Sequence, residues 1–468
     1  MIRSPVRVAL LLSLVGRAPA VAQTAPFDLD KTKTVLSGMI EKAIRERGIP
    51  SISIALVRGD SIVWKAAFGY ANVRTKTPAT PETIYSTGST FKSATATALM
   101  QMVEQKKLDL DQPVNQYLGD IQVQDRLQSD KAVTSRHMLS HWSGLTAGAV
   151  TKPLWGRELP KSLEKMVSGL YSVRAPEAKW EYNNFAFGMA GLMLEKISGT
   201  EYEKYMVENI LKPLGVTTPH PVYPSPEMVE LMALPYSPGG AGGKPTPVGQ
   251  VHFDVYPAGD IYLTAEDMAR FLAMHLNGGT FRGRRIISEA SAKMMREPPY
   301  GGAYGFGLGV RKDPNGHTII AHSGGIPGQS SQMMGDVDAK VGVYYMSNSG
   351  APPTIGEAAL KLLRGEDYTP PPDRKPITVD TKVLDTFVGA YEASAELRFT
   401  ITREGNSLVM RQAGAQAPTA LLAETPTKFF MKGQDFTFTF GAGSSGTIDK
   451  LVIDTGGATI EAKRRPNP

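Results

Sequence analysis

The 468-residue sequence predicts an α/β (α+β) fold: an antiparallel sheet flanked by helices with an all-helical subdomain, followed by a small all-β domain. Three observations lead to this fold class. Strand patterns occur before residue 70 and again after residue 300, the chain between them reads mostly as helices and loops, and short strands alone follow a proline-rich break. Strands from two distant segments around a helical middle are typical of one sheet built from both ends, with helices packed on it.

The first elements of the chain read as a helix and a hairpin. Apolar residues spaced for one helix face run through Thr34–Arg47, and Gly48 ends the pattern. Ser51–Val57 and Ser61–Phe68 have strand composition and are joined by Arg58-Gly59-Asp60. We therefore expect an antiparallel hairpin at the start of the sheet.

Strand patterns return late in the first part of the chain, around a Pro314-Asn315-Gly316 turn. The expected strands are Tyr304–Arg311, His317–His322, Gln332–Met334 and Val341–Ser347. Ile355–Leu363 then reads as a helix, which closes the first unit.

A proline-rich break, Tyr368-Thr369-Pro370-Pro371-Pro372, is stiff enough to separate two units. The strands expected beyond it are Leu397–Thr402, Ser407–Arg411, Lys428–Met431, Phe436–Phe440, Lys450–Ile453 and Thr459–Ala462. We expect a main domain over 27–367, a linker over 368–376 and a small all-β accessory domain over 377–468.

The N-terminal residues have the layout of a secretory signal. Arg3 and Arg7 precede an apolar stretch, Val8–Val15, and a small-residue site follows at Ala20-Val21-Ala22, with Arg17 as an irregularity in the cleavage region. We expect a signal peptide over 1–22 and export across the inner membrane, to the periplasm. The alternative is a membrane anchor, but the apolar stretch is far shorter than the roughly 20 residues that a spanning helix needs.

Composition excludes several classes of function. The sequence has no cysteine, which excludes disulfides, thiol nucleophiles, thiolate zinc sites and a lipid-modified N-terminal cysteine. The formal net charge is +6, which is too small to indicate a nucleic-acid partner, and the one basic run is the short Lys463-Arg464-Arg465.

The stretch Ser86–Lys92, STGSTFK, precedes an uncharged helix. Ser93–Val103 has apolar or small residues on nearly every face, which predicts a helix buried all round, so that Lys92 enters a core. Burial lowers the pKa of a lysine and makes its amine a usable base near neutral pH. Ser89 lies three residues earlier on the same face, so the pair offers a nucleophile and an adjacent base. The alternative is that the hydroxyl residues cap the helix and the lysine is solvated.

A second Ser-x-x-Lys match shows that the pattern alone is weak, because it arises by chance on the order of once or twice in a chain this long. Ser162-Leu163-Glu164-Lys165 lies among charges on both sides, as a solvated helix would. The surroundings therefore favour Ser89 over Ser162.

Two later segments carry further polar groups. Glu181-Tyr182-Asn183-Asn184 opens an expected helix over Phe185–Ile197. The strand that ends at His322 continues into Ser323-Gly324-Gly325, where the glycines allow close approach of a substrate's backbone.

These segments, in this order, resemble the penicillin-recognising serine hydrolases: class C β-lactamases, low-molecular-mass penicillin-binding proteins, D-stereospecific peptidases and related carboxylesterases. The matching motifs are Ser89-Thr90-Phe91-Lys92, Tyr182-Asn183-Asn184 and His322-Ser323-Gly324, with similar flanking text at 135–145, 257–271 and 322–331. The resemblance covers Thr34–Leu363, and the appended β domain resembles one often found behind such hydrolases.

The resemblance implies acyl-enzyme chemistry. Ser89 would be the nucleophile, while Lys92 and Tyr182 would share proton transfer to the leaving group and from the deacylating water. The backbone N–H groups of Ser89 and Gly325 would form the oxyanion hole. No cofactor is implied.

The resemblance also implies the substrate contacts. Asn184 would hold the substrate's amide and the lysine, and His322, Ser323 and Gly324 would lie along the substrate. Many family members carry lysine where this chain has His322, and that cation suits substrates with a carboxylate, whereas histidine is mostly neutral near pH 7. We therefore expect a D-amino-acid-type peptidase or related peptidase acting on a small-molecule or peptide substrate, with a carboxylesterase or a β-lactamase as alternatives.

Rival classes remain at this point. A zinc hydrolase is one, since His137 and His141 lie four residues apart and His252-Phe253-Asp254 adds two ligands, although no His-Glu-x-x-His motif occurs. A non-catalytic penicillin-binding sensor or scaffold is another. An α/β-hydrolase is disfavoured because no Gly-x-Ser-x-Gly occurs. The glycine-rich loop Ser237–Thr246 reads equally as a connector or as an active-site flap.

Overall fold

The computed structural model describes residues 26–146, 154–155, 162–218, 222, 226–238, 243–370, 374–393, 397–412, 418–431, 436–443, 446–454 and 459–465. The expected signal peptide over 1–22 lies outside these ranges, as do residues 371–373 of the expected linker and residues 239–242 of the glycine-rich loop.

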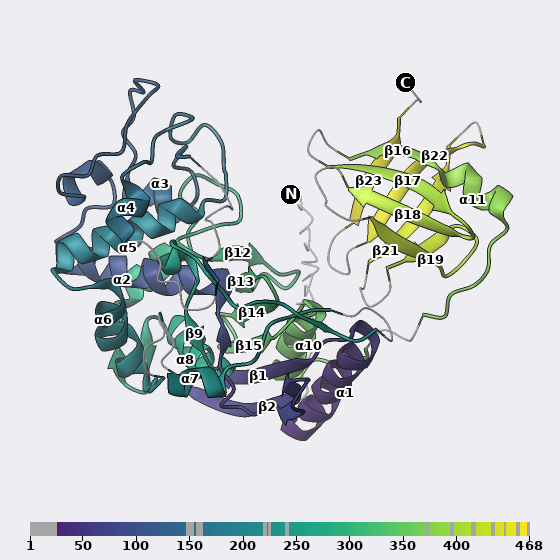
Figure 1. Ribbon diagram of the computed structural model, residues 1–468, viewed down its shortest axis with the longest axis horizontal. Helices are drawn as coiled ribbons and strands as arrows, with labels where there is room; N and C mark the ends of the chain where they lie inside the picture. Colours follow the sequence, from purple (N-terminus) through teal and green to yellow (C-terminus); the bar gives the residue numbers. More distant parts are fainter. Residues whose placement is uncertain are drawn as a thin grey trace, which may run out of the picture.

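The main sheet is antiparallel and is built from both ends of the first unit (Figure 1), as the sequence predicts. Its strand order is β12-β13-β14-β15-β1-β2-β3, so the first strand pairs with the last, with Ile52 opposite Ser347. The strands are β1 (Ser51–Arg58), β2 (Ser61–Asn72), β3 (Thr77–Pro78), β12 (Gly309–Lys312), β13 (Thr318–Ile326), β14 (Gln329–Asp336) and β15 (Val341–Ser347).

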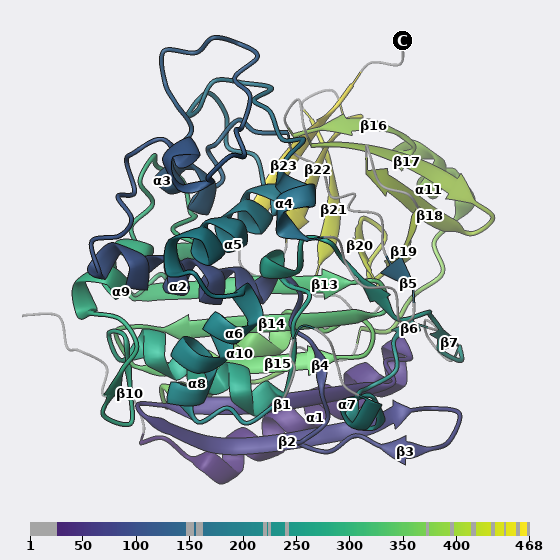
Figure 2. The ribbon, with the colours of Figure 1, turned by 60° about the vertical axis from the view of Figure 1, so that its left-hand side comes forward.

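Helices cover both faces of this sheet (Figure 2). On one face, α1 (Leu29–Arg47) and α10 (Thr354–Leu363) pack on alternate β1 residues that include Ile52 and Ile54. On the other face, α8 (Ala265–Leu276) and the helical subdomain pack on Ala55 and Val57. All of β1 except Arg58 is buried, because both faces of a covered sheet are apolar.

The helical subdomain surrounds α2 (Lys92–Glu104), which continues a 3₁₀ turn, η1 (Gly88–Phe91). Every residue from Lys92 to Met100 is buried, which confirms the expectation of a helix packed on all faces. The other helices here are α3 (Ser135–Leu139), α4 (Leu163–Val167), α5 (Asn184–Ser198), α6 (Tyr202–Met206), α7 (Pro226–Leu231) and α9 (Glu289–Met295), with shorter turns η2 (Val114–Tyr117), η3 (Val207–Leu211), η4 (Lys212–Leu214) and η5 (Tyr256–Ala258). Among the described residues, no helix has the length and hydropathy of a membrane span.

Short strand pairs tie the loops together. They are β4 (Tyr85–Ser86) with β9 (Tyr262–Leu263), β5 (Leu154–Trp155) with β8 (Val251–His252), β6 (Tyr236–Ser237) with β7 (Thr246–Pro247), and β10 (Thr280–Phe281) with β11 (Arg284–Arg285). The β4–β9 pair holds the segment before η1 in place, since Thr87 N also donates to Ile261 O.

The C-terminal unit is a closed barrel of eight strands with one short helix, α11 (Thr381–Phe387) (Figure 1). The strands are β16 (Gly389–Glu392), β17 (Arg398–Glu404), β18 (Ser407–Gln412), β19 (Thr419–Ala423), β20 (Lys428–Phe430), β21 (Thr437–Ala442), β22 (Ile448–Asp454) and β23 (Thr459–Arg464). Sequence patterns found six of these strands and missed β16 and β19. Aromatic rings fill the interior, and the rings of Phe387 and Phe440 stack 4.4 Å apart.

The expected strand over Tyr304–Arg311 is wrong in its first half, because regular pairing with β13 begins at Gly309. Gly307 has a φ of +71°, a left-handed conformation that interrupts extended backbone. A Cβ at Gly307 would lie 2.7 Å from the carbonyl oxygen of Lys92, so this turn packs directly on the start of α2.

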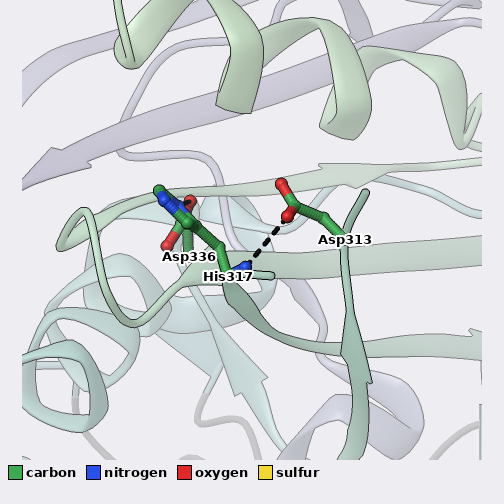
Figure 3. Close-up of side chains that lie close together, drawn as sticks. All are labelled: Asp313, His317 and Asp336. Atoms are coloured by element: carbon green, nitrogen blue, oxygen red, sulfur yellow. Dashed lines mark hydrogen bonds and ion pairs between the residues drawn. The ribbon is translucent and has the colours of Figure 1, made fainter. Parts of the chain in front are cut away.

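An ionic cluster around the buried Asp336 anchors the start of β13 (Figure 3). His317 Nδ1 lies 2.7 Å from an Asp336 carboxylate oxygen, and hydrogen bonding to this carboxylate raises the pKa of His317. Arg364, just after α10, donates from Nη1 to Asp313 at 3.0 Å and to Asp336 at 2.9 Å. The Asp336 side chain is fully buried, so its charge depends on these partners.

We predict that Arg364→Met lowers the free energy of unfolding by about 3 kcal/mol, because it leaves the buried Asp336 carboxylate short of its cation. The control is Arg311→Met, which removes an exposed ion pair with Glu357 and should cost less than about 1 kcal/mol. Urea denaturation of both variants measures the difference. Equal, small losses would show that the cluster is not an anchor.

Candidate active site

Ser89 and Lys92 form the centre of the candidate site. Residues three apart lie on one face of the 3₁₀ turn that leads into α2, and Lys92 Nζ lies 3.0 Å from Ser89 Oγ. Lys92 Nζ also donates to the carbonyl oxygen of Ala258, at 2.7 Å. The Ser89 side chain is half-buried, so its hydroxyl is accessible while the lysine beside it is not.

Burial holds the pKa of Lys92 well below its ordinary value of 10.5. The side chain is fully buried, and no acidic group forms an ion pair with it in the part of the chain that the structure describes. Its Nζ lies 4.9 Å from the ring centroid of Tyr182 and 5.6 Å from that of Phe187. An amine in such surroundings is driven toward its neutral, proton-accepting form.

Tyr182 lies on the other side of the nucleophile. Burial raises the pKa of Tyr182 to about 12, and a hydrogen bond with Ser89 works against that rise. Its phenol therefore stays protonated at neutral pH. The candidate nucleophile thus has an amine of lowered pKa and a phenol within reach.

Asn183, rather than Asn184, caps the helix that follows Tyr182. Its side-chain oxygen accepts from Ala186 N at 3.1 Å, and its Nδ2 donates to the carbonyl oxygens of Leu145 and Thr146. The Asn184 side chain is half-buried and makes no hydrogen bond to Lys92 or to any other described residue. Its expected hold on the lysine is therefore absent here, and its contact with substrate stays a prediction.

Glycines let the nucleophile turn lie against β13. A Cβ at Gly88, where φ is +52°, would lie 2.5 Å from Gly325 N, and a Cβ at Gly324 would lie 2.3 Å from Thr87 O. The turn that carries Ser89 therefore packs directly on Gly324 and Gly325, and the oxyanion hole at Ser89 and Gly325 stays a prediction. Ser323 is exposed on the same strand.

His322 is held as a neutral ring. Its Nδ1 donates to Ser323 O at 2.6 Å, which leaves Nε2 to accept from the Tyr304 hydroxyl at 2.8 Å. Burial, with the nearby Lys92, lowers the pKa of His322 to about 4.

Aromatic rings that the sequence did not single out complete the site. Tyr304 contacts both His322 and His141, with ring centroids 5.7 Å and 4.7 Å away, and Trp180 lies 6.1 Å from Tyr304. Trp180 is 41% exposed. No local pattern marks these residues: Trp180 lies two residues before Tyr182, and Tyr304 reaches the site from a loop that is distant in sequence.

The zinc alternative has no geometric support among these histidines. His137 uses Nδ1 with Thr134 and Nε2 with Glu177, and His141 uses Nδ1 to accept from Asn183 N. Within the described residues, the group whose ligand atoms lie close enough for one ion is Asp313, His317 and Asp336, and Arg364 already bonds both of its carboxylates.

The second Ser-x-x-Lys match is a helix cap. Ser162 is exposed, and its Oγ accepts from the backbone N–H of Lys165 at the start of α4. In STGSTFK, by contrast, Thr87 occupies the cap position without a side-chain capping bond. The capping alternative thus describes Ser162 and not the turn at Ser89.

The sheet, the buried Ser-x-x-Lys turn, the facing tyrosine loop and the glycine-rich strand together define a class, the penicillin-recognising serine hydrolases. The chain belongs to the Beta-lactamase family, whose profile matches residues 36–366. Residues 373–464 match a second profile, Domain of unknown function (DUF3471).

Individual proteins agree with this assignment. The chain is 25% identical to Penicillin-binding protein 4* of Bacillus subtilis (strain 168), over 86% of this chain and 93% of that protein. The octameric penicillin-binding protein homologue from Pyrococcus abyssi superposes with a TM-score of 0.62 at 24% identity, over 93% of this chain and 100% of that one. The D-amino acid amidase from Ochrobactrum anthropi SV3 superposes with a TM-score of 0.57 at 22% identity, over 72% of this chain and 98% of that one. At these identities, the two structures show a shared fold.

Proposed function

We propose that the protein is an exported serine hydrolase that cleaves amide or peptide bonds of the D-amino-acid type through an acyl-enzyme. The observation that carries this proposal is the 3.0 Å contact between the Ser89 hydroxyl and the buried, proton-accepting amine of Lys92. A nucleophile beside a base of lowered pKa is the arrangement that covalent catalysis requires. The proposed division is a catalytic domain over 27–367, a linker over 368–376 and an accessory domain over 377–468, which the family matches support.

In the acylation step, neutral Lys92 takes the proton of Ser89 as Oγ attacks the carbonyl carbon. The carbonyl π electrons move to oxygen, where the N–H groups of Ser89 and Gly325 stabilise the developing charge. The lowered pKa favours Lys92 as the base, and the Tyr182 phenol, which keeps its proton, is the group that donates to the leaving nitrogen. Collapse of the tetrahedral intermediate breaks the carbon–nitrogen bond, and the Lys92 ammonium then returns its extra proton to Tyr182.

In the deacylation step, water replaces the departed amine. It gives a proton to the Lys92–Tyr182 pair while its oxygen attacks the ester carbon, and the second collapse returns that proton to Ser89 Oγ. The products are the acid and free enzyme. Asn184 would bind the substrate's amide from the start of α5.

The neutral His322 supports a substrate without a carboxylate at that position. Its Nε2 accepts from Tyr304, and its pKa of about 4 keeps the ring uncharged near pH 7. The fold shared with the D-amino acid amidase fits an amide substrate. Ester hydrolysis by the same residues is the alternative within the family, and a penicillin-binding sensor that is acylated without turnover is the alternative of another class.

Export and a periplasmic location remain proposals that rest on the N-terminal sequence pattern over 1–22. A small-molecule or peptide partner follows from the proposed reaction.

We predict that Ser89→Ala abolishes both hydrolysis and labelling by a fluorophosphonate probe, because the hydroxyl that lies 3.0 Å from Lys92 Nζ is lost. Ser162→Ala is the matched control: it removes a helix cap and should leave both activities intact. Mass spectrometry of the labelled peptide locates the adduct. Labelling that survives Ser89→Ala, or that maps to Ser162, would refute the proposal.

A second prediction concerns substrate choice. We would measure kcat/KM for D-amino-acid amides and peptides, aryl esters and a chromogenic cephalosporin. The value should be lowest for the cephalosporin, because the neutral His322 ring offers no cation to the cephalosporin's carboxylate. His322→Lys should raise the cephalosporin rate relative to the others by at least about tenfold, the worth of one charged hydrogen bond. A cephalosporin kcat/KM that equals the best substrate's in the unmodified enzyme would contradict this.

A further inference from the structure

His141 lies in the segment between α3 and Tyr182's loop, and it has an unusual backbone. Its φ is +66°, the left-handed region that non-glycine residues rarely adopt, and its side chain is 1% exposed. Strained backbone of this kind persists where the surroundings hold it, and it concentrates at functional sites.

Both flanks of Tyr182 are bonded to this one residue. The N–H of Glu181 donates to the carbonyl oxygen of His141 at 2.9 Å, and the N–H of Asn183 donates to His141 Nδ1 at 3.1 Å. The residues before and after the tyrosine are therefore fixed by the backbone and by the ring of a single histidine. Such a clamp limits where the Tyr182 side chain can lie.

The imidazole also packs on the tyrosine. The ring centroids of His141 and Tyr182 lie 4.4 Å apart, with Phe187 5.4 Å away on another side. Because Nδ1 accepts a hydrogen bond, the proton of the neutral ring is on Nε2, and Nε2 is buried without a partner among the described residues. Among the described residues, the hydrogen bond that Asn183 N–H donates to Nδ1 is therefore the one that orients the His141 ring.

We propose that His141 is a positioning residue that holds the Tyr182 phenol at Ser89 through the bond from Asn183 N–H to Nδ1. This inference rests on the proposed function, in which Tyr182 transfers protons at the nucleophile. A displacement of about 1 Å in such a group costs up to roughly 100-fold in rate.

His137 provides the contrast within the same segment. It is also buried, but its ring caps α3 through Thr134 and pairs with Glu177, with its centroid 5.1 Å from that of Tyr300. Among the described residues, its ring makes no hydrogen bond to Glu181, Tyr182 or Asn183. His137→Ala therefore removes a buried imidazole without touching the clamp.

The test compares two substitutions that both tolerate a left-handed φ. His141→Gly removes the acceptor, whereas the Oδ1 of His141→Asn can take the place of Nδ1. We expect His141→Gly to lower kcat/KM for amide hydrolysis by roughly 10- to 100-fold, because Tyr182 donates its proton to the leaving nitrogen. His141→Asn should recover most of that loss, and His137→Ala should stay within about twofold of the unmodified enzyme. Thermal denaturation checks that each variant is folded.

A double-mutant cycle with Tyr182→Phe separates positioning from a merely structural role. If His141 acts through the phenol, adding His141→Gly to Tyr182→Phe changes kcat/KM for amide hydrolysis by less than about twofold. The inference would be overturned if His141→Gly lowered the activity of Tyr182→Phe by the same factor as it lowers that of the unmodified enzyme. It would also be overturned if His141→Gly and His141→Asn lost equal activity. Failure of the proposed function is seen separately, as labelling that survives Ser89→Ala.

Discussion

The burial of Lys92 is the constraint on which the candidate site depends. Its amine lies at the start of α2, a helix whose other faces are all packed. A solvated lysine beside a serine would carry its proton at neutral pH and could not accept another. Fully buried, with the carbonyl of Ala258 and the ring of Tyr182 as neighbours, the amine is pushed toward its neutral form. The same burial keeps Tyr182 protonated, so that one physical effect assigns opposite proton roles to the two groups that flank Ser89.

Both chain segments that form the sheet support the turn beside that lysine. β13 brings Gly324 and Gly325 against the nucleophile turn, and a Cβ at Gly324 would collide with Thr87 O. The pairing of β1 with β15 joins the two chain segments in one sheet, which supports both β13 and α2. The ionic cluster around Asp336 holds the first residues of β13 in place. Groups far apart in sequence are thereby set within hydrogen-bond distances, with the rigidity that acyl transfer demands.

Sequence reasoning reached the parts of the site that local spacing determines. The contact of Ser89 with Lys92 follows from three residues of separation, and the burial of α2 follows from its uncharged faces. The positions of Tyr182 and His322 rested on family resemblance, because no periodicity brings loops together over such separations. Tyr304 was assigned to a strand because glycine conformations are invisible to an alternation pattern. The helix expected from Phe185 begins one residue earlier, at Asn184 with Asn183 as its cap, since boundaries are set by side-chain bonds to neighbouring backbone.

The charge state of Lys92 is the quantity on which the assigned chemistry depends. Nuclear magnetic resonance titration of protein labelled with ¹³C at lysine Cε reports it directly, with the Lys92 signal identified by its absence in Lys92→Met. We expect this signal to titrate well below 10.5, apart from the solvated lysines. A Lys92 signal that titrates at or above 10.5 would mean that the amine is a cation at neutral pH, and it would contradict its role as the base.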